Sequence, residues 1–335
     1  MAVTIEDIKK LRTMTGAGMK DCKKALAEAD GDIKKAVELV RERGLAIAAK
    51  RSDRTTSNGC VLVKGDNGFF AMIGLKCETD FVANGADYIK LTQDILDAAV
   101  AAKAHTLDEV KELTVSYDGE DVKVADAVTR RSGVVGEKME LDGYNVLEGD
   151  NIYTYDHMGR HTLCTMVQLS AANEDAGHKV AMQVAAMNPV ALDEASVPQN
   201  VKDEELKVAI EKTREEQIQR QVNVALKKAG INANLVDSED HIASNVTKGW
   251  LTQEDADKAR EIIKTVGAEA AGKLNENMIQ NIAKGRMAKF FKENCLVDQE
   301  FQFEEGDKKN VAQWLDAQAK GLKVVAYKRY TLAAD

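Results

Sequence analysis

Proline is scarce in this sequence of 335 residues, which contains only two. Because proline interrupts helices, its scarcity and the 30% of charged residues predict a helix-rich protein. The chain is long enough for two or three domains of ordinary size. Its apolar fraction of 44% supplies enough material for hydrophobic cores.

Cysteine is also sparse, and no two cysteines form a CxxC pair. This spacing argues against a disulfide framework and a zinc site, and it predicts a reducing, cytoplasmic compartment. The first residues carry no basic region and no long apolar run, so we expect no secretory signal, no membrane span and no membrane partner. The five cysteines are Cys22, Cys60, Cys77, Cys164 and Cys295.

Positive charge is in deficit, with a formal net charge of −9. Phosphate binding needs clustered lysine and arginine, so nucleic acid is not expected as the main partner. We find no catalytic constellation and predict no enzyme activity, no cofactor and no metal site. His157 and His161 are four residues apart, but they straddle a predicted hairpin turn and lack a third ligand nearby.

The stretch 77–84 carries the strongest local signals in the chain. It follows an apolar run at 69–75 that predicts a strand. Thr79 or Asp80 can cap a helix start, and Asn84-Gly85 is a stop signal, so we expect a single helical turn. Glu78 and Asp80 are expected to stabilise the N-terminus of this turn through the helix dipole.

Phe81 and Val82 are adjacent and point about 100° apart, so one short turn hardly buries both. Two interpretations of Phe81 follow. It either closes the core beneath the helix start, as most large apolar residues do, or stands out as a contact anchor.

Residues 1–44 predict a module of three short helices, with turns at Gly16-Ala17-Gly18 and Asp30-Gly31-Asp32 and an end at Gly44. A basic, polar linker at 45–58 follows. Arg12, Met19 and Lys23 can line an exposed ridge of this module, which would bind a partner. The alternative is that Met19 is buried and the two charges are simply solvated.

Two similar units make up the predicted core. Residues 59–146 begin with a hairpin around Asn67-Gly68, followed by helices at about 87–102 and 120–131. Residues 147–200 repeat the pattern, with strands at 152–155 and 163–169 and a helix at about 175–187. The sequence therefore predicts an α+β fold with a duplicated hairpin-plus-helix core.

Residues 201–273 predict long, charged helices around a polar loop at 230–249, which we interpret as a helical coiled-coil insertion. Residues 274–335 are expected to return to the second core unit, 147–200, with a helix around 311–319 and a closing strand at 323–330.

Several stretches of the chain resemble the elongation factor Ts family. Thr79-Asp80-Phe81-Val82-Ala83 after a strand is similar to its signature, and residues 11–26 are similar to its N-terminal module. Residues 178–189 resemble the second signature of the family, and residues 285–293 and 324–330 resemble its C-terminal half.

The resemblance implies a ubiquitin-associated-like N-terminal module and a guanine-nucleotide exchange factor of translation elongation, with elongation factor Tu, GDP-bound or nucleotide-free, as the partner. The corner Thr79, Asp80, Phe81 and Val82 would be linked to Mg²⁺ release. Other residues matched to partner contacts are Arg12, Met19, Lys23, Ala83, Asn84 and His157.

Two departures from the family pattern are visible. The segment 229–273 is extra length in the arm, and the C-terminal helical tail of some members has no counterpart here. The alternative function is a non-enzymatic helical adaptor that binds ubiquitin-like or other protein partners. The oligomeric state stays open at this point.

Overall fold

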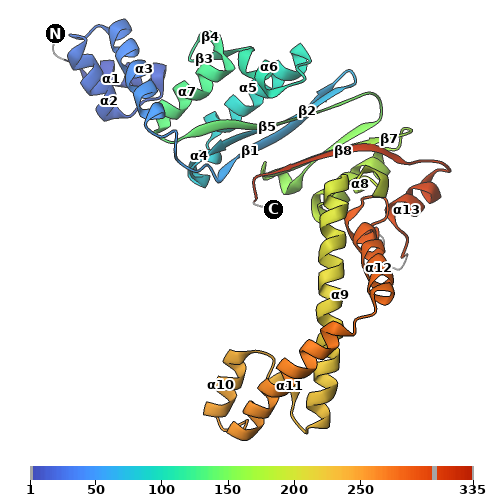
Figure 1. Cartoon of the computed structure of the whole chain (residues 1–335). Coiled ribbons are helices and arrows are strands. Elements are labelled where there is room, and N and C mark those ends of the chain that lie inside the picture. The colour runs from blue at the N-terminus through green and yellow to red at the C-terminus, as the bar shows by residue number, and fades with distance from the viewer. Residues whose placement is uncertain (1–2, 304–307, 334–335) are drawn as a thin grey trace. The chain divides into compact units, whose positions relative to one another are not determined.

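A computed structural model describes residues 3–303 and 308–333 (Figure 1). The chain divides into two compact units, residues 1–192 with 300–335, and residues 193–299. The first unit combines helices with antiparallel sheets, and the second is helical, so the predicted α+β fold class is confirmed. The finer division of the chain stays a prediction. It comprises the module 1–44, the linker 45–58, the core units 59–146 and 147–200 with 274–335, and the insertion 201–273.

Three helices open the first unit, as predicted. Thr4 and Asp7 form a capping box at the first helix, and Asp32 caps the third. Leu11, Cys22 and Leu26 lie fully buried between them. The helices are α1 (Ile5–Thr15), α2 (Met19–Glu28) and α3 (Ile33–Ala49).

The predicted end of α3 at Gly44 is wrong, because the helix continues to Ala49. Gly44 is buried and keeps a helical backbone; its missing side chain allows close packing against Gly133 of α7 (Val124–Val135). A Cβ atom built on Gly133 would lie 2.3 Å from the Gly44 Cα atom. Glu120 adds ion pairs with Arg41 of α3 at 2.9 Å and with Arg130 of α7 at 3.1 Å.

The first sheet has the strand order β1-β2-β5, and all its pairings are antiparallel. Asn67 and Gly68 both have positive φ in the β1–β2 turn, which confirms the predicted hairpin. Tyr88, Ile95 and Leu96 of α5 are fully buried in the core that covers this sheet. The elements are β1 (Asn58–Asp66), β2 (Phe69–Cys77), β5 (Met139–Glu148), α4 (Asp80–Ala83) and α5 (Ala86–Ala102).

The prediction of a helix at 120–131 placed its start four residues before the observed one. Residues Glu120–Lys123 form strand β4, which pairs with β3 (Thr114–Tyr117), and α7 begins only at Val124. Asp118 and Gly119 turn the chain between the strands with positive φ at both positions. The short helix α6 (Leu107–Glu112), capped by Thr106, precedes this hairpin and was not predicted.

The second sheet has the order β6-β7-β8 and is also antiparallel. It repeats the arrangement of the first, a hairpin joined by a third strand from later in the chain, so the predicted duplication and closing strand are confirmed. Asn188 ends α8 with positive φ, just before Pro189. The elements are β6 (Ile152–Asp156), the 3₁₀ turn η1 (His157–Gly159), β7 (Leu163–Leu169), α8 (Glu174–Met187), α13 (Val311–Gln318) and β8 (Val324–Thr331).

The second unit is built on one helix of 30 residues, α9, against which α11 and α12 pack in succession (Figure 1). The predicted polar loop at 230–249 is wrong, because Ile231, Val236 and Ile242 are buried there in a small core of their own. The elements are η2 (Glu194–Ser196), α9 (Gln199–Lys228), η3 (Ala233–Leu235), α10 (Glu239–Thr247), α11 (Gln253–Gly272) and α12 (Glu276–Asn294).

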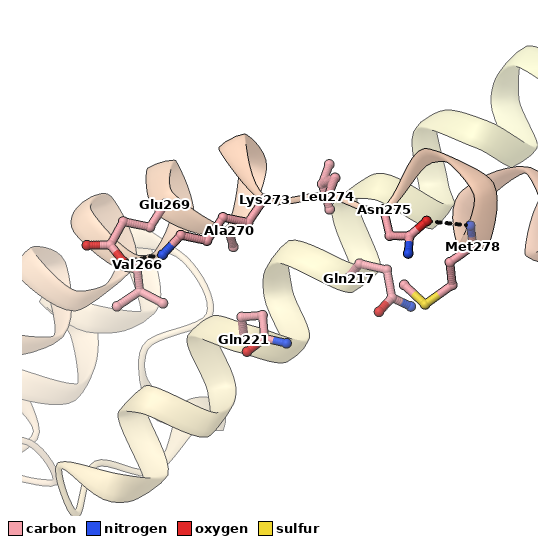
Figure 2. A pocket seen from close by; sticks show the side chains of 9 residues that line it. All are labelled: Gln217, Gln221, Val266, Glu269, Ala270, Lys273, Leu274, Asn275 and Met278. Carbon is pink, nitrogen blue, oxygen red and sulfur yellow. Dashed lines mark hydrogen bonds and ion pairs between the residues drawn. The ribbon is translucent and has the colours of Figure 1, made fainter.

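Figure 2 shows the groove beside α9 where α11 ends and α12 begins. Asn275 caps α12 by accepting a hydrogen bond of 3.1 Å from the Met278 backbone N–H. The groove encloses about 350 Å³ and contains none of the residues predicted for partner binding. Its lining residues are Gln217, Gln221, Val266, Glu269, Ala270, Lys273, Leu274, Asn275 and Met278.

The α3–α7 contact predicts a sharp response to one methyl group. Gly133→Ala should lower the unfolding free energy of the first unit by about 1–3 kcal/mol, because the new Cβ atom meets backbone that cannot move aside. Gly285→Ala in α12 is the control: apart from its chain neighbours and the nearby backbone of its own helix, no atom lies within 4 Å of its Cβ position, so it should stabilise the second unit by about 0.4–1 kcal/mol. Denaturant unfolding of each variant measures both changes, and a neutral Gly133→Ala would contradict the close packing.

Candidate functional site

The corner after β2 forms because its ends are capped. Thr79 has an extended backbone, and its hydroxyl accepts a hydrogen bond of 3.4 Å from the Val82 N–H. Asn84 ends the turn by donating its N–H to the Asp80 carbonyl at 3.0 Å. The predicted single helical turn is therefore confirmed, and the cap is Thr79, the first of the two alternatives.

Phe81 is the most exposed large apolar side chain among the described residues, at 86% of its full surface. Its neighbours Val82 and Ala83 are buried, each 8% exposed. Of the two interpretations of Phe81, burial beneath the helix start is wrong and the outward-facing ring is what the structure contains. An exposed aromatic ring loses the hydrophobic stabilisation that burial would give it, so it calls for a functional explanation.

The action of Glu78 and Asp80 on the dipole of α4 stays a prediction: Asp80 lies in the first turn of α4, whereas Glu78 lies before it and has hydrogen-bond partners elsewhere. Its carboxylate accepts hydrogen bonds from the Lys138 backbone N–H at 2.7 Å and from Arg51 Nη1 at 3.0 Å. The bond from Lys138, followed by Arg51, holds the pKa of Glu78 below its ordinary value. Glu78 is thus tied to the chain that follows α7 and to the segment that follows α3.

Glu137, the residue before Lys138, binds in turn to Thr79, the residue after Glu78. Its carboxylate accepts from the Thr79 backbone N–H at 3.0 Å and from the Thr79 hydroxyl at 2.7 Å. Sequence reasoning missed Glu137 and Arg51. Glu137 lies 58 residues from Thr79, and Arg51 lies 27 residues from Glu78. A local sequence pattern does not predict contacts over such separations.

The remaining corner residues predicted to bind the partner are all present at the surface or just below it. Asp80 and Asn84 are exposed, and the Asn84 side-chain amide donates to the Asp80 carbonyl at 2.9 Å. Ala83 is buried beneath the turn. A partner that approaches this corner would therefore meet Phe81, Asp80 and Asn84 first.

Arg12, Met19 and Lys23 are exposed on α1 and α2 of the N-terminal module. Met19 keeps 45% of its surface, while Cys22 on the same helix is fully buried. This exposure favours the partner-binding ridge over the alternative in which Met19 is core. The roles of the three residues stay predictions.

His157 lies in the turn between β6 and β7, where it is half-buried. Its Nδ1 atom lies 3.2 Å from the Tyr155 hydroxyl, and the two rings meet edge to face. Met158, at the tip of the same turn, is 66% exposed and has a φ of 57°. Sequence reasoning singled out His157 and missed Met158, the more accessible side chain.

His161 has a different partner, Asp156, whose carboxylate meets its Nδ1 atom. Across residues 3–303 and 308–333, no group of three histidine, cysteine, aspartate or glutamate side chains could hold a metal ion. All five cysteines are buried and unpaired. None of the helices in the described ranges is both long and apolar enough to cross a membrane.

Comparison with known proteins decides the family. A family model described as Elongation factor TS matches residues 78–237 and 221–334, which include the turn α4, strand β5 of the first sheet and all of the second sheet. The chain belongs to the elongation factor Ts family. It is a translation elongation factor by that membership.

Individual members of the elongation factor Ts family match from end to end. Elongation factor Ts of Bacteroides fragilis is 59% identical over 336 residues, that of Phocaeicola vulgatus 57% over 335, and that of Parabacteroides distasonis 56% over 335. Each match covers 100% of this chain and 100% of the relative. The matched length therefore includes residues 229–273 of this chain.

The ionised state of Glu78 should stabilise the fold in a pH-dependent way. Because its pKa is lower in the folded chain than the unfolded value of about 4.3, its contribution is complete above that value and is lost as the pH falls through the lowered pKa. The stability difference between the parent and Glu78→Gln should thus be constant from pH 7 to about 5 and then shrink. Chemical unfolding at each pH measures it, and a difference that grows on acidification would contradict the geometry.

Proposed function

We propose that this protein is a guanine-nucleotide exchange factor that binds elongation factor Tu in its GDP form and promotes release of GDP. The observation that carries the proposal is the outward ring of Phe81 on a corner capped at both ends. Membership of the elongation factor Ts family supports the choice of partner. Such a factor acts in the cytoplasm and catalyses no covalent reaction of its own.

The proposed mechanism is mechanical and electrostatic. Phe81 would enter the GTPase beside its nucleotide site and shift the segment that holds the Mg²⁺ ion and the phosphates. A Mg²⁺ ion neutralises phosphate charge, so its displacement lowers the affinity for GDP. Coupling between two binding sites is reciprocal, so bound GDP must weaken the binding of this protein by the same factor.

Two further surfaces would fix the orientation of the partner. The ridge of Arg12, Met19 and Lys23 offers a mixed apolar and basic face. The β6–β7 turn offers Met158 and the edge of His157. Contacts at several places on the first unit would let binding energy be used to strain the nucleotide site of the partner.

A release assay tests the proposal directly. Purified GTPase is loaded with a fluorescent GDP analogue, and release is followed after addition of excess GDP with or without this protein. Substoichiometric amounts of the protein should accelerate release of the whole pool. An unchanged release rate at saturating protein would overturn the proposed function.

Phe81→Ala should slow stimulated GDP release by about 30- to 1,000-fold, the equivalent of about 2–4 kcal/mol for a hot-spot aromatic. Its melting temperature should stay close to that of the parent, since the ring is already exposed. Differential scanning fluorimetry and the release assay give the two quantities on one preparation.

Val82→Ala is the matched control, because it alters the next residue of the same turn, whose side chain is buried. Val82 is buried, so truncation should cost about 2 kcal/mol of folding stability. Exchange by the folded fraction should fall less than with Phe81→Ala. A Phe81→Ala variant that melts early yet exchanges normally would contradict the proposed insertion of the ring into the partner.

A further inference from the structure

Residues 78–79, just before Phe81, and residues 137–138 are joined by reciprocal hydrogen bonds. Glu78 reaches across to the backbone of Lys138, at 2.7 Å. Glu137, the neighbour of Lys138, reaches back to the backbone and the hydroxyl of Thr79, at 3.0 and 2.7 Å. Each segment thus supplies one carboxylate and one backbone N–H to the other.

The Glu137 side of this clamp is itself fixed. Gly136 ends α7 with a φ of 77°, a conformation that favours glycine. The buried Ser132 hydroxyl donates to the Glu137 carbonyl at 2.6 Å. The Glu137 carboxylate is therefore presented from a helix end whose path is set by hydrogen bonds.

The Glu78 side is fixed as well. Arg51 donates to its carboxylate at 3.0 Å, and the side-chain amide of Asn58 in β1 donates to its carbonyl at 2.9 Å. Residues 78 and 79, which precede α4, are consequently held in place.

A clamp of this kind matters because α4 is only four residues long. One helical turn does not hold its own shape in water, and the exposed Phe81 ring contributes almost no packing of its own. The direction of the ring is then set by the backbone at Thr79, together with the buried side of the turn.

We propose that Glu137, with Glu78 as its reciprocal partner, is a positioning residue for Phe81 in nucleotide exchange. Neither carboxylate touches the nucleotide. They hold the corner in the orientation in which the ring enters the partner, so that little ordering remains to be done on binding. This inference rests on the proposed exchange function.

The experiment measures stimulated GDP release against protein concentration for the parent and for Glu137→Ala. A loosened corner still docks through the other surfaces, so the maximal rate should fall about tenfold, with little change in the half-saturating concentration. Glu137→Gln should keep most of the rate, because its amide oxygen can accept from the Thr79 N–H and its amide nitrogen can donate to the Thr79 hydroxyl. Asp121→Ala, an exposed carboxylate in β4 of the same unit, should exchange like the parent.

A double-mutant cycle separates positioning from a general structural effect. In the Phe81→Ala background, Glu137→Ala should cost less than twofold, because there is no ring left to position. An equal loss in both backgrounds would overturn the proposal, as would full activity of Glu137→Ala with an unchanged melting temperature.

If Glu137→Ala does not fold, Glu137→Asp replaces it in the same cycle, since its shorter side chain withdraws the carboxylate while keeping the charge. If the parent itself fails to accelerate release, the proposed function fails; if only the cycle fails, the positioning role of Glu137 fails while the exchange function stands.

Discussion

A single helical turn that carries an exposed aromatic ring depends on the structure around it. In this protein the support is a set of hydrogen bonds between residues 78–79 and 137–138. Glu78 accepts from Lys138, and Glu137 accepts from Thr79. The first sheet makes them possible, because β2 ends at Cys77 next to Met139, where β5 begins. The pairing of these two strands therefore brings the clamp residues together before any side chain is considered.

The N-terminal module is connected to the same place. Helix α3 packs on α7 through Gly44 and Gly133, and α7 leads directly into Glu137. Arg51, just beyond α3, reaches Glu78 from the other side. The exposed ridge of α1 and α2 thus belongs to the same compact unit as the corner, through the contact between α3 and α7.

Local patterns in the sequence predicted much of this architecture. Capping residues and the Asn67-Gly68 turn located the first hairpin and the single turn at 80–83, and the repeated strand pattern revealed the duplicated core. The angle between Phe81 and Val82 limited burial to one of them, but it did not say which. That choice depends on where the sheet and α5 lie, which is information from distant parts of the chain.

The failures have the same origin. A glycine after a helical stretch predicts a helix end, but Gly44 lies within α3, and its close contact with Gly133 cannot be seen from either local sequence. The segment 230–249 has few apolar residues and therefore predicts a polar loop. Ile231 and Ile242 form a core only with residues of other elements, such as Val222 of α9, and this contact cannot be seen in the local sequence. Glu78 and Glu137 were missed as a pair because their contact follows from strand pairing between β2 and β5.

Photo-crosslinking tests the central claim, that the ring at position 81 faces outward into the partner. A benzoylphenylalanine placed at Phe81 is irradiated in the complex with the GDP-bound GTPase, and the crosslinked peptides are identified by mass spectrometry. The account predicts crosslinks to the segment of the GTPase that binds Mg²⁺ and the phosphates, and their loss when the GTPase is omitted. Crosslinks confined to this protein's own chain, with or without the GTPase, would contradict it.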